Sequence, residues 1–220
     1  MGTITKLGGI AAATVMVLAA GPAAVMPAHA APQPMPKLSG STTFTLSTET
    51  VTNMAGWGIV TTVTPPASMT TAPPVTLTFP VTGYSDSGIT HGGSVSFSSK
   101  DNPQGLEGTS PVLSFTGDDT LSVTLTVAGL PVSLFDITEV TKSTSETTIR
   151  RAGKVWKAKR VVSLSGTLRF TTNKTIMDAM NGYLGTPTAF VPGLAIGTMS
   201  SAMTETKVCK TRADCGFASG

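Results

Sequence analysis

The most unusual chemistry in the sequence lies in one basic run. Eleven consecutive residues carry six cations, one tryptophan and no acid, namely Arg150, Arg151, Lys154, Trp156, Lys157, Lys159 and Arg160. On a strand, successive side chains point to opposite faces, so the run would divide its cations between two faces. Two interpretations stay open. The run is either an edge hairpin that lysines protect from aggregation or a patch that binds anionic envelope polymers or lipid headgroups.

Residues that could perform catalysis are scarce. His91 is the one histidine beyond the N-terminal leader, and it stands in the turn-rich stretch TGYSDSGITHGG without a nucleophile elbow elsewhere in the chain. The sequence therefore predicts a turn histidine that is bonded to backbone or solvent. Asp118 and Asp119 lack the spaced oxygen ligands of a calcium loop and predict a turn. No zinc pattern or phosphate-binding glycine loop is present. These observations favour a protein that is not an enzyme, with a carboxylate-dependent hydrolase as the weaker alternative.

Two cysteines, Cys209 and Cys215, lie close together near the C-terminus. In an oxidising compartment such a pair is expected to form a disulfide that closes a small loop. The alternatives are two reactive thiols or half of a metal site. The disulfide is the preferred interpretation, because no histidine lies near them in the sequence.

Two similar modules would position the remaining candidate residues. Gly40 to Trp57 aligns without gaps with Gly166 to Tyr183, and each copy predicts a strand that leads into a helix. Ser47 and Asn173 occupy equivalent places, where each can accept a hydrogen bond from the first helical turn. We expect helices at residues 47 to 56 and 174 to 184, with Gly56 and either Gly182 or Gly185 as left-handed stops.

Both modules end in an aromatic residue, Trp57 in the first and Tyr183 in the second. These side chains could form the floor of a ligand groove between the two helices. They could also pack each helix end against the sheet, because large aromatic side chains bury much area. Both interpretations are kept.

The first thirty residues predict a signal peptide, with Lys6, an apolar run and a small-residue cleavage site that ends at Ala30. We therefore expect a secreted protein, either extracellular or associated with the cell envelope, and no transmembrane segment. Residues 31 to 40 are proline-rich and predict a flexible lead into one domain at 41 to 204, followed by a tail at 205 to 220. The net charge of +3 is too small to indicate nucleic-acid binding.

Short alternating segments account for most of the predicted domain. The segments VTLTFPV, GSVSFSS and LSVTLTV each place apolar residues at every second position, with turn residues between them. After Gly129, PVSLFDITEV continues as another strand, which we expect to pair antiparallel with LSVTLTV. PPASMTTAPP, which has paired prolines at both ends, predicts a loop. Strands of this length and spacing are typical of an all-β protein, and we predict an antiparallel β-sandwich with two short α-helices.

The order of these parts resembles a known family. FTLSTETVTNMAGWG, TLTFPVTG, ITHGGSVSFSSKD, LSVTLTVAGLPVSLFDI and GLAIGT together look like exported actinobacterial proteins that are distantly similar to the haem-transport-associated (HtaA) domain. The resemblance covers the chain from about Ser39 to Thr204. It implies a β-sandwich with two short helices at a Gram-positive envelope.

The haem chemistry of that family departs from this sequence. In the family, a tyrosine on the first short helix ligates iron and a histidine follows the strand that GSVSFSS resembles. Here the helix STETVTNMAG has no tyrosine, and the position after the strand is Lys100. Tyr183 or His91 would be the remaining candidate iron ligands, with Trp57 as a stacking wall.

Two functions are therefore expected. The first is a non-enzymatic envelope protein, without a cofactor, that binds cell-envelope polymer, an anionic lipid surface or an envelope protein. The alternative is HtaA-like binding of haem or another flat apolar ligand.

Overall fold

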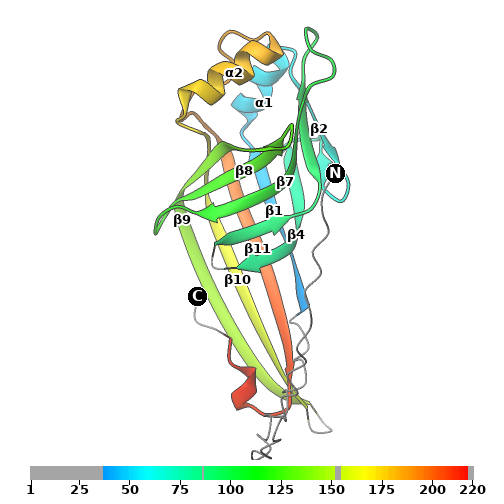
Figure 1. Cartoon of the computed structure of the whole chain (residues 1–220), viewed down its shortest axis with the longest axis vertical. Helices are drawn as coiled ribbons and strands as arrows, with labels where there is room; N and C mark the ends of the chain where they lie inside the picture. The colour runs from blue at the N-terminus through cyan, green and yellow to red at the C-terminus, as the bar shows by residue number, and fades with distance from the viewer. Residues whose placement is uncertain (1–36, 86, 152–154, 218–220) are drawn as a thin grey trace, which may run out of the picture. The chain divides into compact units, whose positions relative to one another are not determined.

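The computed structural model describes residues 37–85, 87–151 and 155–217, all within one compact unit, Pro34–Gly220. The predicted signal peptide and cleavage site lie outside the described residues. The fold is mostly β with two α-helices (Figure 1). Its elements are β1 (Lys37–Leu46), α1 (Thr48–Gly56), β2 (Val60–Thr64), β3 (Ser68–Thr70), β4 (Thr76–Ser85), β5 (Gly88–His91), β6 (Ser94–Ser98), β7 (Leu106–Phe115), β8 (Leu121–Val127), β9 (Leu130–Arg151), β10 (Val155–Phe170), α2 (Lys174–Leu184), β11 (Ala195–Cys209) and a 3-10 turn, η1 (Ala213–Cys215).

The sheet closes on itself, so the predicted sandwich is wrong in its layer arrangement. Strands pair antiparallel in the order β7, β5, β4, β1, β11, β10, β9, β8, and β8 pairs again with β7. The result is an eight-stranded antiparallel barrel, with β6 and β2 continuing from β7 and β3 lying beside β4. Alternating strands are equally compatible with a sandwich and with a closed ring, because both have one face inside.

A bulge in β7 allows the closure. The register between β7 and β8 shifts between Thr109 and Val112, where Ser110 has a φ of 51°. Before the bulge β7 pairs with β6, and after it β7 pairs with β5, while β8 occupies the other edge. The extra residue bends β7 and increases its twist, so the two halves of β7 can pair with different strands on the same side.

Both predicted helices are present at their predicted positions. The hydroxyl of Ser47 accepts a hydrogen bond from the backbone N–H of Thr50 (3.1 Å), and Asn173 Oδ1 accepts from two backbone N–H groups of α2. Gly185 ends α2 in the left-handed conformation, as one of the two predicted stops. The first helix differs, because its cap is Trp57 and the following Gly58, not Gly56, takes a positive φ.

Two segments expected to lack strand structure contain strands. Within the predicted loop PPASMTTAPP, Ser68–Thr70 pairs with β4. His91 ends β5 and pairs with Val81 of β4, so it does not stand in a turn. In both cases, turn residues flank a strand that is too short to show a clear alternation in the sequence.

Strands β9, β10 and β11 are barrel strands at one end. Their other ends continue past the rest of the barrel and form an arm (Figure 1). β8 pairs with β9 only as far as Ile137, whereas β10 pairs with β9 up to Arg151. β1 begins at Lys37, inside the predicted flexible lead, and β11 continues to Cys209, inside the predicted tail. Among the described residues, no helix combines the length and apolar character needed to cross a bilayer.

A substitution at Gly197 can test how closely β1 and β11 approach one another. A Cβ added at Gly197 in β11 would overlap the carbonyl oxygen of Thr45 in β1. We expect Gly197→Ala to lower the free energy of unfolding by about 1–3 kcal/mol, because backbone atoms must shift to make room. Urea unfolding of the mature chain measures this change.

Gly182→Ala in α2 is the matched control, since nothing lies within 4 Å of its added Cβ. Alanine is also the better helix former, so the control should keep or raise the stability. Equal stability of the two variants would contradict the close strand approach.

Candidate functional site

An apolar groove, which we call the α2 groove, separates one face of α2 from the ends of β7, β8 and β9. Its volume is about 350 Å³. Helix residues Ile176, Ala179, Met180 and Tyr183 lie on one side of it, because spacings of three and four place them on one helical face. The complete lining is Leu106, Val127, Val132, Leu134, Thr175, Ile176, Ala179, Met180 and Tyr183. No charged side chain is among these residues.

The α2 groove adjoins a more polar hollow of about 310 Å³. The two share Leu106, Val127 and Tyr183, while Glu107, Thr109 and Thr126 also line the second hollow. Glu107 Oε1 accepts a hydrogen bond from the Ser94 hydroxyl (2.7 Å), which fixes the carboxylate. A ligand in the α2 groove would therefore meet hydrocarbon along α2 and polar groups at this end.

Tyr183 stands at the boundary between the two hollows. Its side chain is 48% exposed, and its hydroxyl donates to the carbonyl oxygen of Gly105 (3.2 Å). Two further hydrogen bonds tie this end of α2 to the same loop: the Asn102 amide donates to Tyr183 O (3.2 Å), and the Ser99 hydroxyl donates to Leu184 O (2.7 Å). The ring of Tyr183 is therefore held in place beside the groove.

The structure does not bring the three predicted ligand residues together. Tyr183 lines the α2 groove, but Trp57 and His91 do not. Trp57 follows α1 and is 40% exposed. Sequence reasoning identified one aromatic residue of the groove and missed its aliphatic lining. The helical spacing of Ile176, Ala179 and Tyr183 was the available signal.

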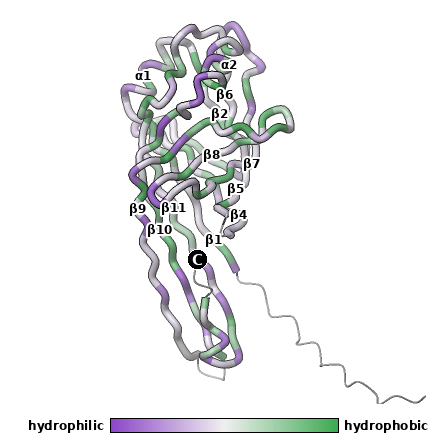
Figure 2. Tube along the Cα trace, turned by 60° about the vertical axis from the view of Figure 1, so that its left-hand side comes forward, coloured by the Kyte–Doolittle hydropathy of each residue, from purple (hydrophilic) through white to green (hydrophobic). Residues whose placement is uncertain are grey.

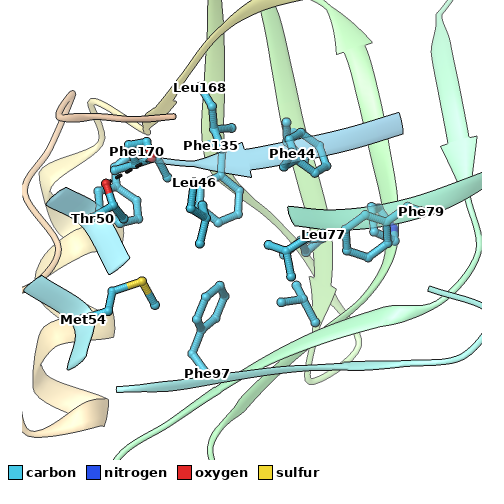
Figure 3. A pocket seen from close by; sticks show the side chains of 15 residues that line it. Phe44, Leu46, Thr50, Met54, Leu77, Phe79, Phe97, Phe135, Leu168 and Phe170 are labelled. Atoms are coloured by element: carbon cyan, nitrogen blue, oxygen red, sulfur yellow. Dashed lines mark hydrogen bonds between the residues drawn. The ribbon is translucent and has the colours of Figure 1, made fainter. Parts of the chain in front are cut away.

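The barrel interior beneath α1 is filled by side chains. Figure 3 shows Thr50 and Met54 of α1 facing a group of phenylalanines that includes Phe97 and Phe170. The Thr50 hydroxyl donates to Ile196 O (3.0 Å), which ties α1 to β11. The remaining cavity measures about 40 Å³. A macrocycle such as haem does not fit there, and α1 supplies no tyrosine, histidine or cysteine to hold its iron.

His91 lies in a buried polar network inside the barrel. Its Nδ1 donates to Pro111 O (3.0 Å), and its Nε2 lies 2.7 Å from Thr42 Oγ1, which is also 2.8 Å from Ser201 Oγ. Thr42, His91 and Ser201 are each at most 4% exposed. Burial lowers the pKa of His91, partly offset by the hydrogen bond to Pro111. With both ring nitrogens engaged and no access from solvent, His91 is placed to join strands β1, β5 and β11.

The basic run divides between two faces of β10. Arg160 turns inward, where its guanidinium bonds Glu205 (2.7 Å) and lies over the rings of Phe217 (4.8 Å) and Tyr84 (5.8 Å). Lys157 and Lys159 alternate with the inward residues and face outward, Lys159 being exposed.

Of the other members of the run, Lys154 and the side chains of Arg150 and Arg151 lie outside the described residues. Trp156 lies beneath the Arg212 guanidinium, 5.9 Å from it.

Cys209 and Cys215 form the predicted disulfide. Both are buried, and they pack with Ala158, Trp156 and Phe217 in a small second core beneath the arm. The bond is consistent with an oxidising, extracytoplasmic compartment.

Within the described residues, no group of three His, Cys, Asp or Glu side chains is arranged to hold a metal ion. Asp118 and Asp119 lie in the connection between β7 and β8, as predicted for a turn, and Asp119 O accepts a hydrogen bond from Val140 N (3.0 Å).

No protein-family model and no curated protein matches the chain. Two solved structures are similar to it. The haem-binding protein HtaB from Corynebacterium glutamicum is 16% identical with a TM-score of 0.48, over 78% of this chain and 96% of that chain. The C-terminal domain of HtaA from the same organism is 11% identical with a TM-score of 0.42, over 77% of this chain and 99% of that chain. The second of these structures is a domain of HtaA, which gives its name to the family that the sequence resembles.

The buried position of His91 predicts a dependence of stability on pH. Because its pKa is lowered in the folded protein, the unfolded chain binds a proton at higher pH than the native protein does. The free energy of unfolding should therefore fall as the pH drops below the unfolded value of about 6.5. Urea unfolding at pH 7.5 and 5.5 measures this loss.

His91→Gln keeps a hydrogen-bonding side chain and removes the titration. Whatever its absolute stability, this variant should lose less stability between the two pH values than the unchanged protein. The same loss in both proteins would show that His91 does not cause it.

Proposed function

We propose that the protein is an exported, non-enzymatic binding protein that holds a flat apolar ligand in the α2 groove. The observation that carries the proposal is the uncharged, aliphatic lining of this groove with the fixed ring of Tyr183 at its edge. Ligand sites are typically concave and mainly apolar, with a few placed polar groups and volumes of about 300–1,000 Å³. The α2 groove has this chemistry and size.

The groove favours a ligand that is apolar along its length and polar at one edge. Ile176, Val127 and Val132 offer hydrocarbon surface, and the adjoining hollow offers Thr109 and Thr126. A tetrapyrrole combines an apolar macrocycle with polar substituents, and haem is the ligand that the sequence resemblance suggests.

Iron coordination does not drive the proposed binding. Two side chains of the groove lining could ligate haem iron, Tyr183 and Met180. The Tyr183 hydroxyl already donates to Gly105 O, and Met180 is only 3% exposed. The lining has no imidazole or thiolate. Affinity would then come from burial of the ring against hydrocarbon, at roughly 25 cal/mol per Å² of apolar surface removed from water.

A titration with two probes tests the proposal. Hemin and metal-free protoporphyrin IX should bind the mature protein with similar affinity, and Tyr183→Phe should retain both. Ala179→Glu should weaken both at least tenfold, because binding would strip water from a new carboxylate inside the groove. Absorbance and tryptophan fluorescence follow the titrations.

Ala55→Glu is the control, since it makes the same change at an exposed position of α1. Equal affinity of the Ala179 and Ala55 variants would remove the α2 groove as the site. Binding of hemin alone, abolished by Tyr183→Phe, would replace the apolar mechanism with iron ligation.

The outer face of β10 supports a second, separate function. Lys157 and Lys159 both point away from the barrel interior, and Arg160 does not share their face. We propose that these two lysines contribute to attachment to anionic envelope polymer or lipid.

Replacing both lysines by glutamate should reduce retention on anionic vesicles severalfold at low salt. The control is Arg212→Glu, which alters a cation outside the basic run. Unchanged retention of the lysine variant would refute attachment through this face.

A further inference from the structure

The free edge of β9 offers a surface that the ligand groove does not use. Beyond Ile137, β9 has no described strand on the side opposite β10, and residues 141–148 are all exposed. Strand β9 forms the left edge of the arm in Figures 1 and 2. Its exposed stretch therefore presents unpaired backbone donors and acceptors along one edge.

This edge has little of the protection usual for exposed strands. The stretch TKSTSETT contains four threonines, no proline and no glycine, so it favours a regular strand. Natural edges are commonly blunted by several lysines, prolines or bulges. Here one lysine and one glutamate leave the stretch without net charge, and its alternation is unbroken.

The two charges indicate which partner the edge fits. Lys142 and Glu146 lie on the same face of β9, opposite Leu164 and Arg160 of β10. Arg160 pairs with Glu205, so Glu146 has no ion-pair partner among the described side chains. Lys142 Nζ lies 5.8 Å from the centre of the Phe115 ring, and its flexible stem can also reach toward the edge.

We propose that two copies of the chain pair antiparallel through their β9 edges, centred on Thr144. A two-fold axis through this residue places Lys142 of each copy directly opposite Glu146 of the other, which forms two ion pairs. A centre on Lys142 or on Glu146 would instead set like charges against each other. Directly opposed unlike charges stabilise strand pairs and like charges destabilise them, so the charge pattern selects the Thr144 register.

The pairing is symmetric and closes after two copies. An isologous interface uses the same surface on both partners, and here each copy contributes the same edge of β9. The combined sheet would run β10, β9, partner β9, partner β10. The α2 groove lies at the opposite end of β9 and stays open.

Sedimentation velocity of the mature protein over a concentration series tests the interface. The unchanged chain should form a dimer. Glu146→Lys and Lys142→Glu should each weaken it about tenfold, because each replaces two unlike pairs with two like pairs. The double variant Lys142→Glu/Glu146→Lys should restore it. Lys100→Glu, which changes a charge in the connection between β6 and β7, should leave it unaltered.

A cysteine pair tests the register directly. Thr144→Cys should form a disulfide-linked dimer under mild oxidation, since residue 144 faces its own copy across the axis. Thr148→Cys on the same edge should not, because the two copies of residue 148 would be about 26 Å apart at 3.3 Å per residue. A monomer at every concentration would overturn the proposal. A dimer whose affinity is the same in the charge variants, or one that cross-links equally at residues 144 and 148, would also overturn it.

Discussion

The bulge in β7 is the constraint on which the rest of the structure depends. By changing the direction of one strand at Ser110, it allows β6 and β5 to pair in succession along one edge while β8 holds the other. The barrel closes through this strand. Pro111, within the bulge, supplies the carbonyl that fixes His91, and Leu106 at the start of β7 lines the α2 groove. The barrel interior and the α2 groove therefore both depend on the position of β7.

The two ends of the closed sheet differ in what covers them. At one end α1 and α2 pack on the barrel, and phenylalanines fill the space beneath α1, leaving only about 40 Å³. The proposed site for an apolar ligand is therefore the groove between α2 and the ends of β7, β8 and β9. Toward the arm, the Arg160 guanidinium bonds Glu205 and lies over the Phe217 ring, and the Cys209–Cys215 disulfide holds the tail nearby. Beyond Ile137, the arm leaves one edge of β9 without a described partner strand.

Local features were predictable from the sequence, and long-range features were not. The caps at Ser47 and Asn173 depend on neighbouring residues, so both helices could be placed from sequence alone. Closure into a barrel depends on which distant strands pair, which alternation does not encode. His91 was assigned to a turn because glycines surround it. The groove lining joins residues from 106 to 183, and only the helical spacing around Tyr183 was visible beforehand.

We propose that an apolar ligand binds outside the barrel, in the groove along α2. Methyl NMR spectra of the mature protein, recorded during a titration with protoporphyrin IX, distinguish this site from the barrel interior. Ring-current shifts are expected at the groove methyls of Ile176, Val127 and Val132. Shifts confined to the interior methyls of Leu77 and Met54, with the groove methyls unchanged, would contradict it.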